Sequence, residues 1–184
     1  GYTVRNLRRY RASIPSNGPK VIANVGGDTI DEVLGCFRAV EPYADAVELD
    51  LTCPNVQMEG DLARLEGIVK AMEIAITERT KPLLLKLPFR SYGESEWRGL
   101  DMARAAVKIG LDGITAEGIL RVEDHRLSKR QVVLSGPPCL ETTLKVVREL
   151  RAALGEEVPI RMSGGASSGK DVFRILEAGA NAVN

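Results

Sequence analysis

The sequence lacks the features of several large protein classes. Its 25 Lys and Arg residues balance 25 Asp and Glu residues, so it has no basic excess. A protein that neutralises many phosphates usually carries such an excess, and the balance argues against nucleic-acid binding. No apolar run approaches the ~20 residues that a membrane-spanning helix needs, and no signal peptide opens the chain. We therefore expect a cytoplasmic protein.

Cysteine and histidine are also scarce. The three cysteines, Cys36, Cys53 and Cys139, are far apart in the sequence and odd in number. Their spacing excludes a C-x-x-C metal site and argues against a disulfide framework, which agrees with a reducing compartment. Cys36 and Cys139 fall in or beside helical stretches and are expected to be packing residues. The single histidine, His125, stands among charged residues and is expected to be solvated.

What the sequence does have is a regular alternation of short apolar runs with amphipathic stretches. The runs, each an expected strand, are 21–25, 46–51, 82–87, 113–116, 158–162 and 180–183. The expected helices are 29–40, 62–78, 96–109, 140–154 and 168–178. Residues 119–138 show no clear periodicity and are expected to form a long loop. Arg5, Arg8, Arg9 and Arg11 are expected to form a solvated helical face rather than an anion or partner site.

Strands that alternate with helices require right-handed crossovers and give a parallel sheet. Six such strands fit either an open doubly wound sheet or most of an eight-stranded barrel. A complete (β/α)8 TIM barrel typically needs ~250 residues. We therefore expect residues 1–184 to form one incomplete α/β barrel domain of about six units, without its first two strands. The chain begins at Gly1 rather than Met and stops within an apolar stretch, so both ends are expected to be cut.

Polar residues and glycines follow the expected strands, where parallel β/α folds place their ligand sites. They are expected to gather at one rim of the sheet. Among them, residues 163–170 join a strand to a helix, and the glycines favour either a phosphate cradle or a tight turn. Gly164 to Lys170 also fits the start of a P-loop, but Asp171 occupies the position of the magnesium-binding Ser or Thr and argues against one.

Two side chains at this rim can carry chemistry. Cys53 precedes Pro54, which ends strand pairing and is expected to leave the thiol at the rim, where it can act as a base or nucleophile. The alternative is a small buried residue that only fills space. Lys86 follows three leucines and is expected to face an anion or an electron-rich ring. The alternative is a lysine that extends its ammonium group to solvent.

Five segments, taken in order, resemble the dihydroorotate dehydrogenases, most closely the cytosolic branch that works with an iron–sulfur flavoprotein partner. They are 21–27, 48–55, 84–87, 134–137 and 163–165. The resemblance implies FMN as cofactor and Cys53 as the base that removes the C5 proton of dihydroorotate while hydride leaves C6 for the flavin. It also implies a cytoplasmic pyrimidine-biosynthesis enzyme, and we expect a homo-oligomer without a metal site. The implied FMN contacts are Asn24, Asp50, Lys86, Gly136, Gly164 and Gly165, and the implied substrate contacts are Asp50, Asn55 and Gly118.

Two positions depart from the family pattern. Asp50 stands where the family has Asn, and an ionised Asp can only accept hydrogen bonds. Gly118-Ile119 stands where the family has an Asn-Thr pair that grips orotate. Dihydroorotate is therefore expected to be a poorer substrate here. Two other functions remain open: a flavin-free phosphate-binding barrel enzyme, such as a lyase or isomerase, and a diverged relative with another substrate or no catalysis.

Overall fold

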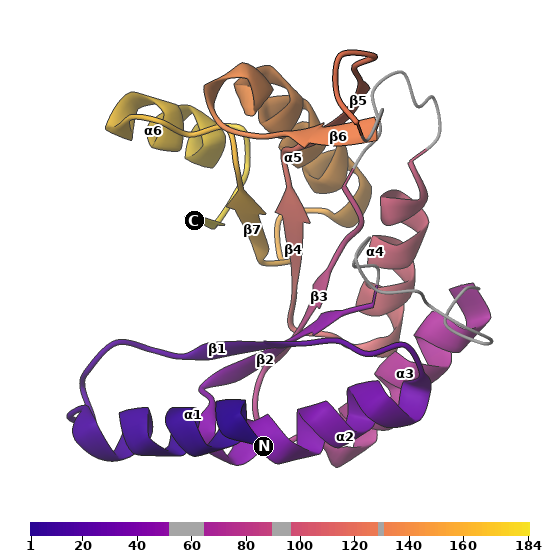
Figure 1. Cartoon of the computed structure of the whole chain (residues 1–184). Coiled ribbons are helices and arrows are strands. Elements are labelled where there is room, and N and C mark those ends of the chain that lie inside the picture. Colours follow the sequence, from indigo (N-terminus) through magenta and orange to yellow (C-terminus); the bar gives the residue numbers. More distant parts are fainter. Residues whose placement is uncertain (52–64, 90–96, 129–130) are drawn as a thin grey trace. The chain divides into compact units, whose positions relative to one another are not determined.

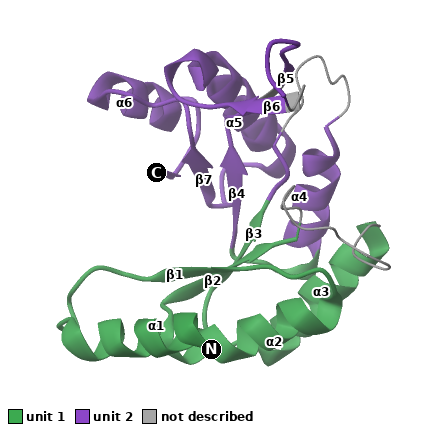
Figure 2. Ribbon diagram, viewed as in Figure 1, with its two compact units in different colours: residues 1–86, 109–112 green, residues 87–108, 113–184 purple. Residues whose placement is uncertain are grey.

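The computed structural model of the chain describes residues 1–51, 65–89, 97–128 and 131–184. The chain divides into two compact units, which Figure 2 shows in separate colours. Unit 1 contains residues 1–86 and 109–112, and unit 2 contains residues 87–108 and 113–184. The labels of helices and strands are those of Figure 1.

Unit 1 is built on three parallel strands. They are β1 (Ile22–Val25), β2 (Ala46–Asp50) and β3 (Leu83–Lys86), hydrogen-bonded in the order β1-β2-β3. The helices of this unit are α1 (Tyr2–Ser13), α2 (Ile30–Val40) and α3 (Leu65–Glu78), with a short 3-10 turn, η1 (Glu41–Tyr43). Figure 1 shows α2 running beside β1 and β2, and it contacts both strands and α3.

The strand β2 shows how unit 1 separates its apolar core from its polar face. Val47 and Leu49 are fully buried, whereas Glu48 and Asp50 point to the opposite face of the sheet. Both carboxylate residues are nevertheless buried, at 4% and 9% exposed. A parallel strand that is covered on both faces explains this pattern. The inner, polar face is where the candidate site of unit 1 lies.

Unit 2 contains a second set of three parallel strands, hydrogen-bonded in the order β4-β7-β8. They are β4 (Gly113–Glu117), β7 (Ile160–Ser163) and β8 (Ala182–Val183). Its helices are α4 (Arg98–Ile109), α5 (Leu140–Leu154) and α6 (Gly169–Glu177), with the 3-10 turn η3 (Pro137–Cys139) before α5. The buried face of α5 consists of Thr143, Leu144, Val146, Val147 and Leu150.

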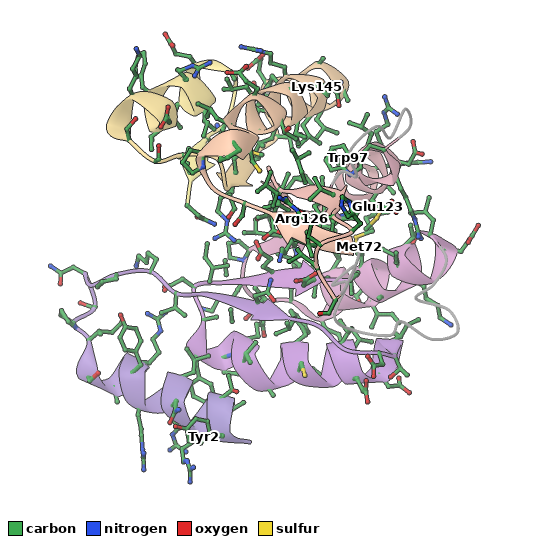
Figure 3. The ribbon with its side chains drawn as sticks, turned by 45° about the horizontal axis from the view of Figure 1, so that its top comes forward. Tyr2, Met72, Trp97, Glu123, Arg126 and Lys145 are labelled. Atoms are coloured by element: carbon green, nitrogen blue, oxygen red, sulfur yellow. The ribbon has the colours of Figure 1, made fainter. Side chains whose placement is uncertain are left out.

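The expectation that residues 119–138 form a long loop is wrong in one respect. Strands β5 (Leu120–Glu123) and β6 (Gln131–Leu134) form an antiparallel hairpin within it. Val133 and Leu134 are exposed and Val122 and Val132 are half-buried, so none of these apolar side chains is fully buried and the sequence shows no clear alternation. Figure 3 labels Glu123 and Arg126 on this hairpin. Arg126 pairs with Asp124 at 2.6 Å, and His125 is exposed as expected.

The other expected elements are confirmed to within about two residues, except that the expected start of α3 lies outside the described residues. Gly110 and Gly179 follow α4 and α6 with φ of +92° and +116°, the left-handed conformation that ends a helix. Trp97, labelled in Figure 3, is 4% exposed and donates its indole N–H to the Pro88 carbonyl at 3.0 Å.

The arginines near the N-terminus lie on α1, as expected. Arg5, Arg8 and Arg9 are exposed. Arg11 instead pairs with Asp45 at 2.7 Å, and the same carboxylate accepts from the Val21 N–H at 2.7 Å. One basic residue of the cluster therefore anchors α1 to the segments that lead into β1 and β2.

Of the two cysteines interpreted as packing residues, one behaves as expected. Cys139 is fully buried, its thiol donates to the Leu134 carbonyl at 3.2 Å, and burial raises the pKa of this thiol. The expectation for Cys36 is wrong: it is exposed on α2. The helix buries Val33, Leu34, Phe37 and Val40, and Cys36 falls outside that stripe. Among the described helices, none is long and apolar enough to cross a membrane.

Arg151 holds the last turns of unit 2 together. Its guanidinium, on α5, donates to the carbonyls of Gly155, Val158 and Gly179 at 2.5 to 3.0 Å. It also donates to Asn181 Oδ1 at 2.9 Å, and that oxygen accepts from the Ile160 N–H at 2.8 Å. A single side chain thus connects α5, the start of β7 and the segment between α6 and β8.

Candidate functional site

In unit 1, polar side chains at the carboxyl ends of the strands contact one another. Asn24 Nδ2 donates to Glu48 Oε1 at 2.8 Å, and Lys86 Nζ donates to Asp50 Oδ2 at 3.1 Å. Each contact joins residues that lie directly opposite each other in adjacent strands. Opposite residues share a face of the sheet, so all four side chains line its inner face.

The ion pair between Asp50 and Lys86 places two opposite charges on this face, which also carries the Glu48 carboxylate. The Asp50 side chain is 10% exposed and that of Lys86 is 23% exposed, so much of the water around both charges has been displaced. A buried carboxylate is costly unless it is paired, and the Lys86 ammonium provides that pairing. Lys86 therefore points along the inner face, as its position after three leucines predicts. Its contact with a cofactor remains a prediction.

The turn after β1 approaches β2 closely. A Cβ on Gly26 would lie 2.9 Å from the carbonyl oxygen of Asp50, and one on Gly27 would lie 2.8 Å from Glu32 Cβ. Thr29 then begins α2, because its hydroxyl accepts from the Glu32 N–H at 3.3 Å. Because Gly26 and Gly27 lack side chains, the backbone that follows Asn24 can pack closely against the end of β2 and the start of α2.

In unit 2, the glycines after β7 are held against helix α5. Gly164 and Gly165 have φ of +87° and +85°, which other residues rarely adopt. The Thr143 hydroxyl donates to the Gly164 carbonyl at 3.1 Å, and the Gly118 N–H donates to the Ser163 carbonyl at 2.7 Å. The Gly118 amide is thus occupied, so any substrate contact from this residue would have to come from its carbonyl.

Gly136, another expected FMN contact, precedes η3 with φ of +85° and has open space around its Cα. It needs glycine for its backbone conformation and not for close packing. The structure therefore explains the residue type at this position without reference to a ligand.

The start of α6 is capped by the protein itself. The Ser168 hydroxyl accepts from the Asp171 N–H, and Asp171 Oδ2 accepts from the Ser167 N–H and from the hydroxyls of Ser167 and Ser168. The expected capping box is present, although the returning carboxylate accepts from the backbone N–H of Ser167 instead of that of the cap residue, Ser168. A carboxylate at this helix start competes with any phosphate placed there and disfavours the P-loop interpretation.

This cap makes a pH-dependent contribution to stability. The hydrogen bond from the Ser168 hydroxyl is the largest influence that holds the Asp171 pKa below its ordinary value, followed by the bonds from Ser167. A depressed carboxyl pKa stabilises the folded state above the unfolded pKa of about 3.9, and this is lost as pH falls through the folded value. We expect the melting temperature of Asp171→Asn to lie below that of the wild type at neutral pH. The difference should shrink below about pH 3.9, and a constant difference throughout acid titration would contradict this.

Cys53 and Asn55, the expected base and one of the expected substrate contacts, lie outside the described residues. Asn24, Asp50 and Lys86 are at strand ends in unit 1. Gly118, Gly164 and Gly165 are at strand ends in unit 2, where Thr143 joins them.

Sequence reasoning missed three residues of these faces. Glu48 was treated as part of a motif and not as a buried carboxylate. Arg161 donates to the hydroxyl of the buried Thr115 at 3.2 Å, on the polar face of β7. Arg161 lies between the buried residues Ile160 and Met162. Because successive residues of a strand point to opposite faces of the sheet, this position could have indicated that Arg161 lies on the polar face. Thr143 gave no signal, because a threonine on a helical stripe is indistinguishable from an ordinary core residue.

Polar groups at the ends of parallel strands that alternate with helices define the chain as a parallel β/α protein. A family profile described as Dihydroorotate dehydrogenase matches residues 2–184. The chain belongs to the dihydroorotate dehydrogenase family.

Curated relatives come from two branches of that family. Dihydroorotate dehydrogenase (quinone) of Verminephrobacter eiseniae is 29% identical over 98% of this chain and 55% of its own length. The catalytic subunit of dihydroorotate dehydrogenase B (NAD(+)) of Oceanobacillus iheyensis is also 29% identical, over 99% of this chain and 59% of its own length. The chain thus spans a little over half of each relative, and identity favours neither branch.

Solved structures share the fold. A crystal structure of the dihydroorotate dehydrogenase of Eimeria tenella with ferulenol has a TM-score of 0.75 at 19% identity, covering 98% of this chain and 56% of that one. A mandelate oxidase with (S)-2-phenylpropionate has a TM-score of 0.60 at 20% identity, covering 96% and 51%. These likenesses confirm the expected barrel fold.

Proposed function

We propose that the protein binds FMN and oxidises dihydroorotate to orotate in pyrimidine biosynthesis. The observation that carries this proposal is the family match over residues 2–184, and the polar strand ends in both units support it. The activity is that of the curated relatives, of which this chain spans just over half.

The residues present fit a flavin. In unit 1, Asn24 offers an amide and Lys86 an ammonium group on the inner face of the sheet. In unit 2, the backbone at Gly164 and Gly165 has no side chain, and a Cβ on Gly165 would meet Leu140 Cα at 2.9 Å. Backbone amides beside such glycines are suited to a phosphate group, because no side chain stands between them and the ligand. Bound FMN would supply the hydride acceptor that no amino-acid side chain provides.

The protein's own part in the reaction is acid–base chemistry and positioning. Cys53 would take the C5 proton of dihydroorotate, a step for which a thiolate is better suited than a neutral thiol. Lys86 would contact the cofactor in addition to its ion pair with Asp50. The Asp50 carboxylate, which can only accept hydrogen bonds, would repel the substrate carboxylate instead of donating a hydrogen bond to it.

The first experiment is the visible absorption spectrum of the purified protein, followed by anaerobic addition of dihydroorotate. We expect a flavin band that bleaches on reduction. Cys53→Ser should keep the flavin band and bleach at least 100-fold more slowly, because a general base typically contributes 10²- to 10⁴-fold. Cys36→Ser, at an exposed position on α2, is the matched control and should bleach at the wild-type rate.

The spectrum also tests the main alternative. A colourless protein that binds a phosphorylated substrate would contradict the proposal and favour a flavin-free barrel lyase or isomerase. The glycine turn after β7 is the specific observation behind that second function. A yellow protein that dihydroorotate does not bleach would instead indicate a flavoprotein with another substrate.

The electron acceptor is a separate proposal. Because the quinone and NAD(+) relatives are equally similar, reoxidation of the reduced protein should be compared with a soluble quinone and with NAD(+). Reoxidation by NAD(+) only when an iron–sulfur flavoprotein subunit is added would support the branch expected from the sequence.

A further inference from the structure

Thr143 occupies the centre of the glycine-rich turns in unit 2. It lies on α5, is 0% exposed, and donates its hydroxyl hydrogen to the Gly164 carbonyl at 3.1 Å. A Cβ on Gly165 would lie 2.7 Å from Thr143 Oγ1. The side chain therefore touches the turn after β7 through both a hydrogen bond and direct packing.

The same side chain fills the space beside Gly118 at the end of β4. A Cβ on Gly118 would overlap the Thr143 side chain and would lie 2.9 Å from its Cα. Since the Cα belongs to the helix backbone, a rotation of the threonine could not relieve the overlap. Glycine at 118 and threonine at 143 are thus mutually dependent: the helix can approach this closely only because residue 118 has no side chain.

The hydrogen bond also fixes the orientation of a peptide plane. In a trans peptide, the carbonyl of one residue and the N–H of the next point in opposite directions. Holding the Gly164 carbonyl towards α5 therefore directs the Gly165 N–H away from α5. With φ of +87° and +85° at the two glycines, the backbone could otherwise adopt other orientations at little cost.

We propose that Thr143 is a positioning residue that aims the Gly165 amide at the phosphate of FMN, and that Gly118 is its required counterpart. This inference rests on the proposed function for the identity of the anion. It also explains why residue 118 is glycine where the family has asparagine. The space that a side chain at the end of β4 would fill is taken by Thr143 from α5. The polar group that results serves the anion turn rather than the substrate.

The hydroxyl is tested by FMN affinity, measured by flavin fluorescence on reconstituted protein. Thr143→Val keeps the shape and removes the hydrogen bond, so it should weaken FMN binding about tenfold. Thr143→Ser keeps the hydroxyl and should stay within about threefold of the wild type. Thr142→Val, one position earlier on α5, is the matched control and should bind as the wild type. Equal affinity of Thr143→Val and wild type, or equal weakening by Val and Ser, would overturn the positioning role.

The dependence on Gly118 is tested by a double substitution. Gly118→Asn alone should lower the melting temperature and prevent FMN retention, because Asn carries a Cβ into Thr143. Gly118→Asn combined with Thr143→Ala should recover part of the melting temperature, because the overlap with Oγ1 is removed while the contacts with the Cβ and Cα of residue 143 remain. If the two substitutions are simply additive in the melting temperature, the proposed pairing is wrong.

Failure of the proposed function is distinguishable from failure of this inference. A wild-type protein with no measurable FMN affinity would overturn FMN as the anion. The melting temperatures and the binding of inorganic phosphate, compared between wild type and Thr143→Val, then decide whether Thr143 positions an anion turn. Loss of phosphate binding in Thr143→Val supports it, and unchanged binding overturns it.

Discussion

Replacing Asp50 by Asn is expected to tighten orotate binding by about ten- to thirtyfold. Two like charges 4 Å apart cost about 4 kcal/mol at an effective dielectric of 20. Lys86, 3.1 Å from the carboxylate, offsets part of that repulsion. A remainder of roughly 1.4–2 kcal/mol corresponds to the stated change in affinity. The substitution would also remove the carboxylate that competes with an anionic ligand for the Lys86 ammonium group.

This effect should appear in the dissociation constant of orotate, measured by perturbation of the flavin spectrum or by calorimetry. Asp45→Asn removes the same charge at the opposite end of β2, where Asp45 pairs with Arg11, and serves as the control. It should leave orotate affinity unchanged. If Asp50→Asn behaves like this control, Lys86 neutralises Asp50 completely and the departure from the family is harmless.

Replacing Gly165 by Ala is expected to weaken FMN binding at least 100-fold. A side chain at φ of +85° costs roughly 1–2 kcal/mol. The added Cβ would also lie 2.7 Å from Thr143 Oγ1 and 2.9 Å from Leu140 Cα, so the turn must move away from α5. A displacement of this backbone removes amide contacts to the phosphate and adds to the conformational cost.

Gly155 provides the matched control for this variant. Its φ of +76° imposes the same kind of backbone strain, but a Cβ there would meet nothing within 4 Å. Gly155→Ala should therefore lose stability in a denaturation experiment and still retain FMN. A folded Gly165→Ala protein with wild-type FMN affinity would show that the turn after β7 does not bind the phosphate.

Periodicity predicted the repeating β/α elements because each buries a regular apolar stripe or run. The α2 helix, for example, buries four residues at helical spacing, and its cap at Thr29 has a readable signal. The β5–β6 hairpin was missed because its strands pair through the backbone while Val133 and Leu134 are exposed, so no strong apolar alternation marks it. Backbone hydrogen bonds leave no pattern in a sequence.

The sequence predicted which residues of the candidate site lie at strand ends, but it did not predict which of them contact one another. Strand ends could be found from apolar runs, and so Asn24, Asp50 and Lys86 were identified. The pairing of Asp50 with Lys86 depends on the register between β2 and β3, which no local pattern specifies. From the sequence alone, Asp50 is therefore expected to be an uncompensated charge. In the same way, the place of Thr143 depends on how α5 packs, which only three-dimensional structure reveals.

The Arg151 contacts imply that the C-terminal part of unit 2 opens as a block. Carbonyls of Gly155, Val158 and Gly179 belong to segments without regular secondary structure, and each would need water if the guanidinium left. Release of the segment between α6 and β8 therefore also removes the hydrogen bonds that hold the turn after α5. The backbone amides of the two segments should consequently lose their protection from hydrogen exchange together. Lysine, with one compact ammonium, cannot span acceptors that a planar guanidinium reaches at once.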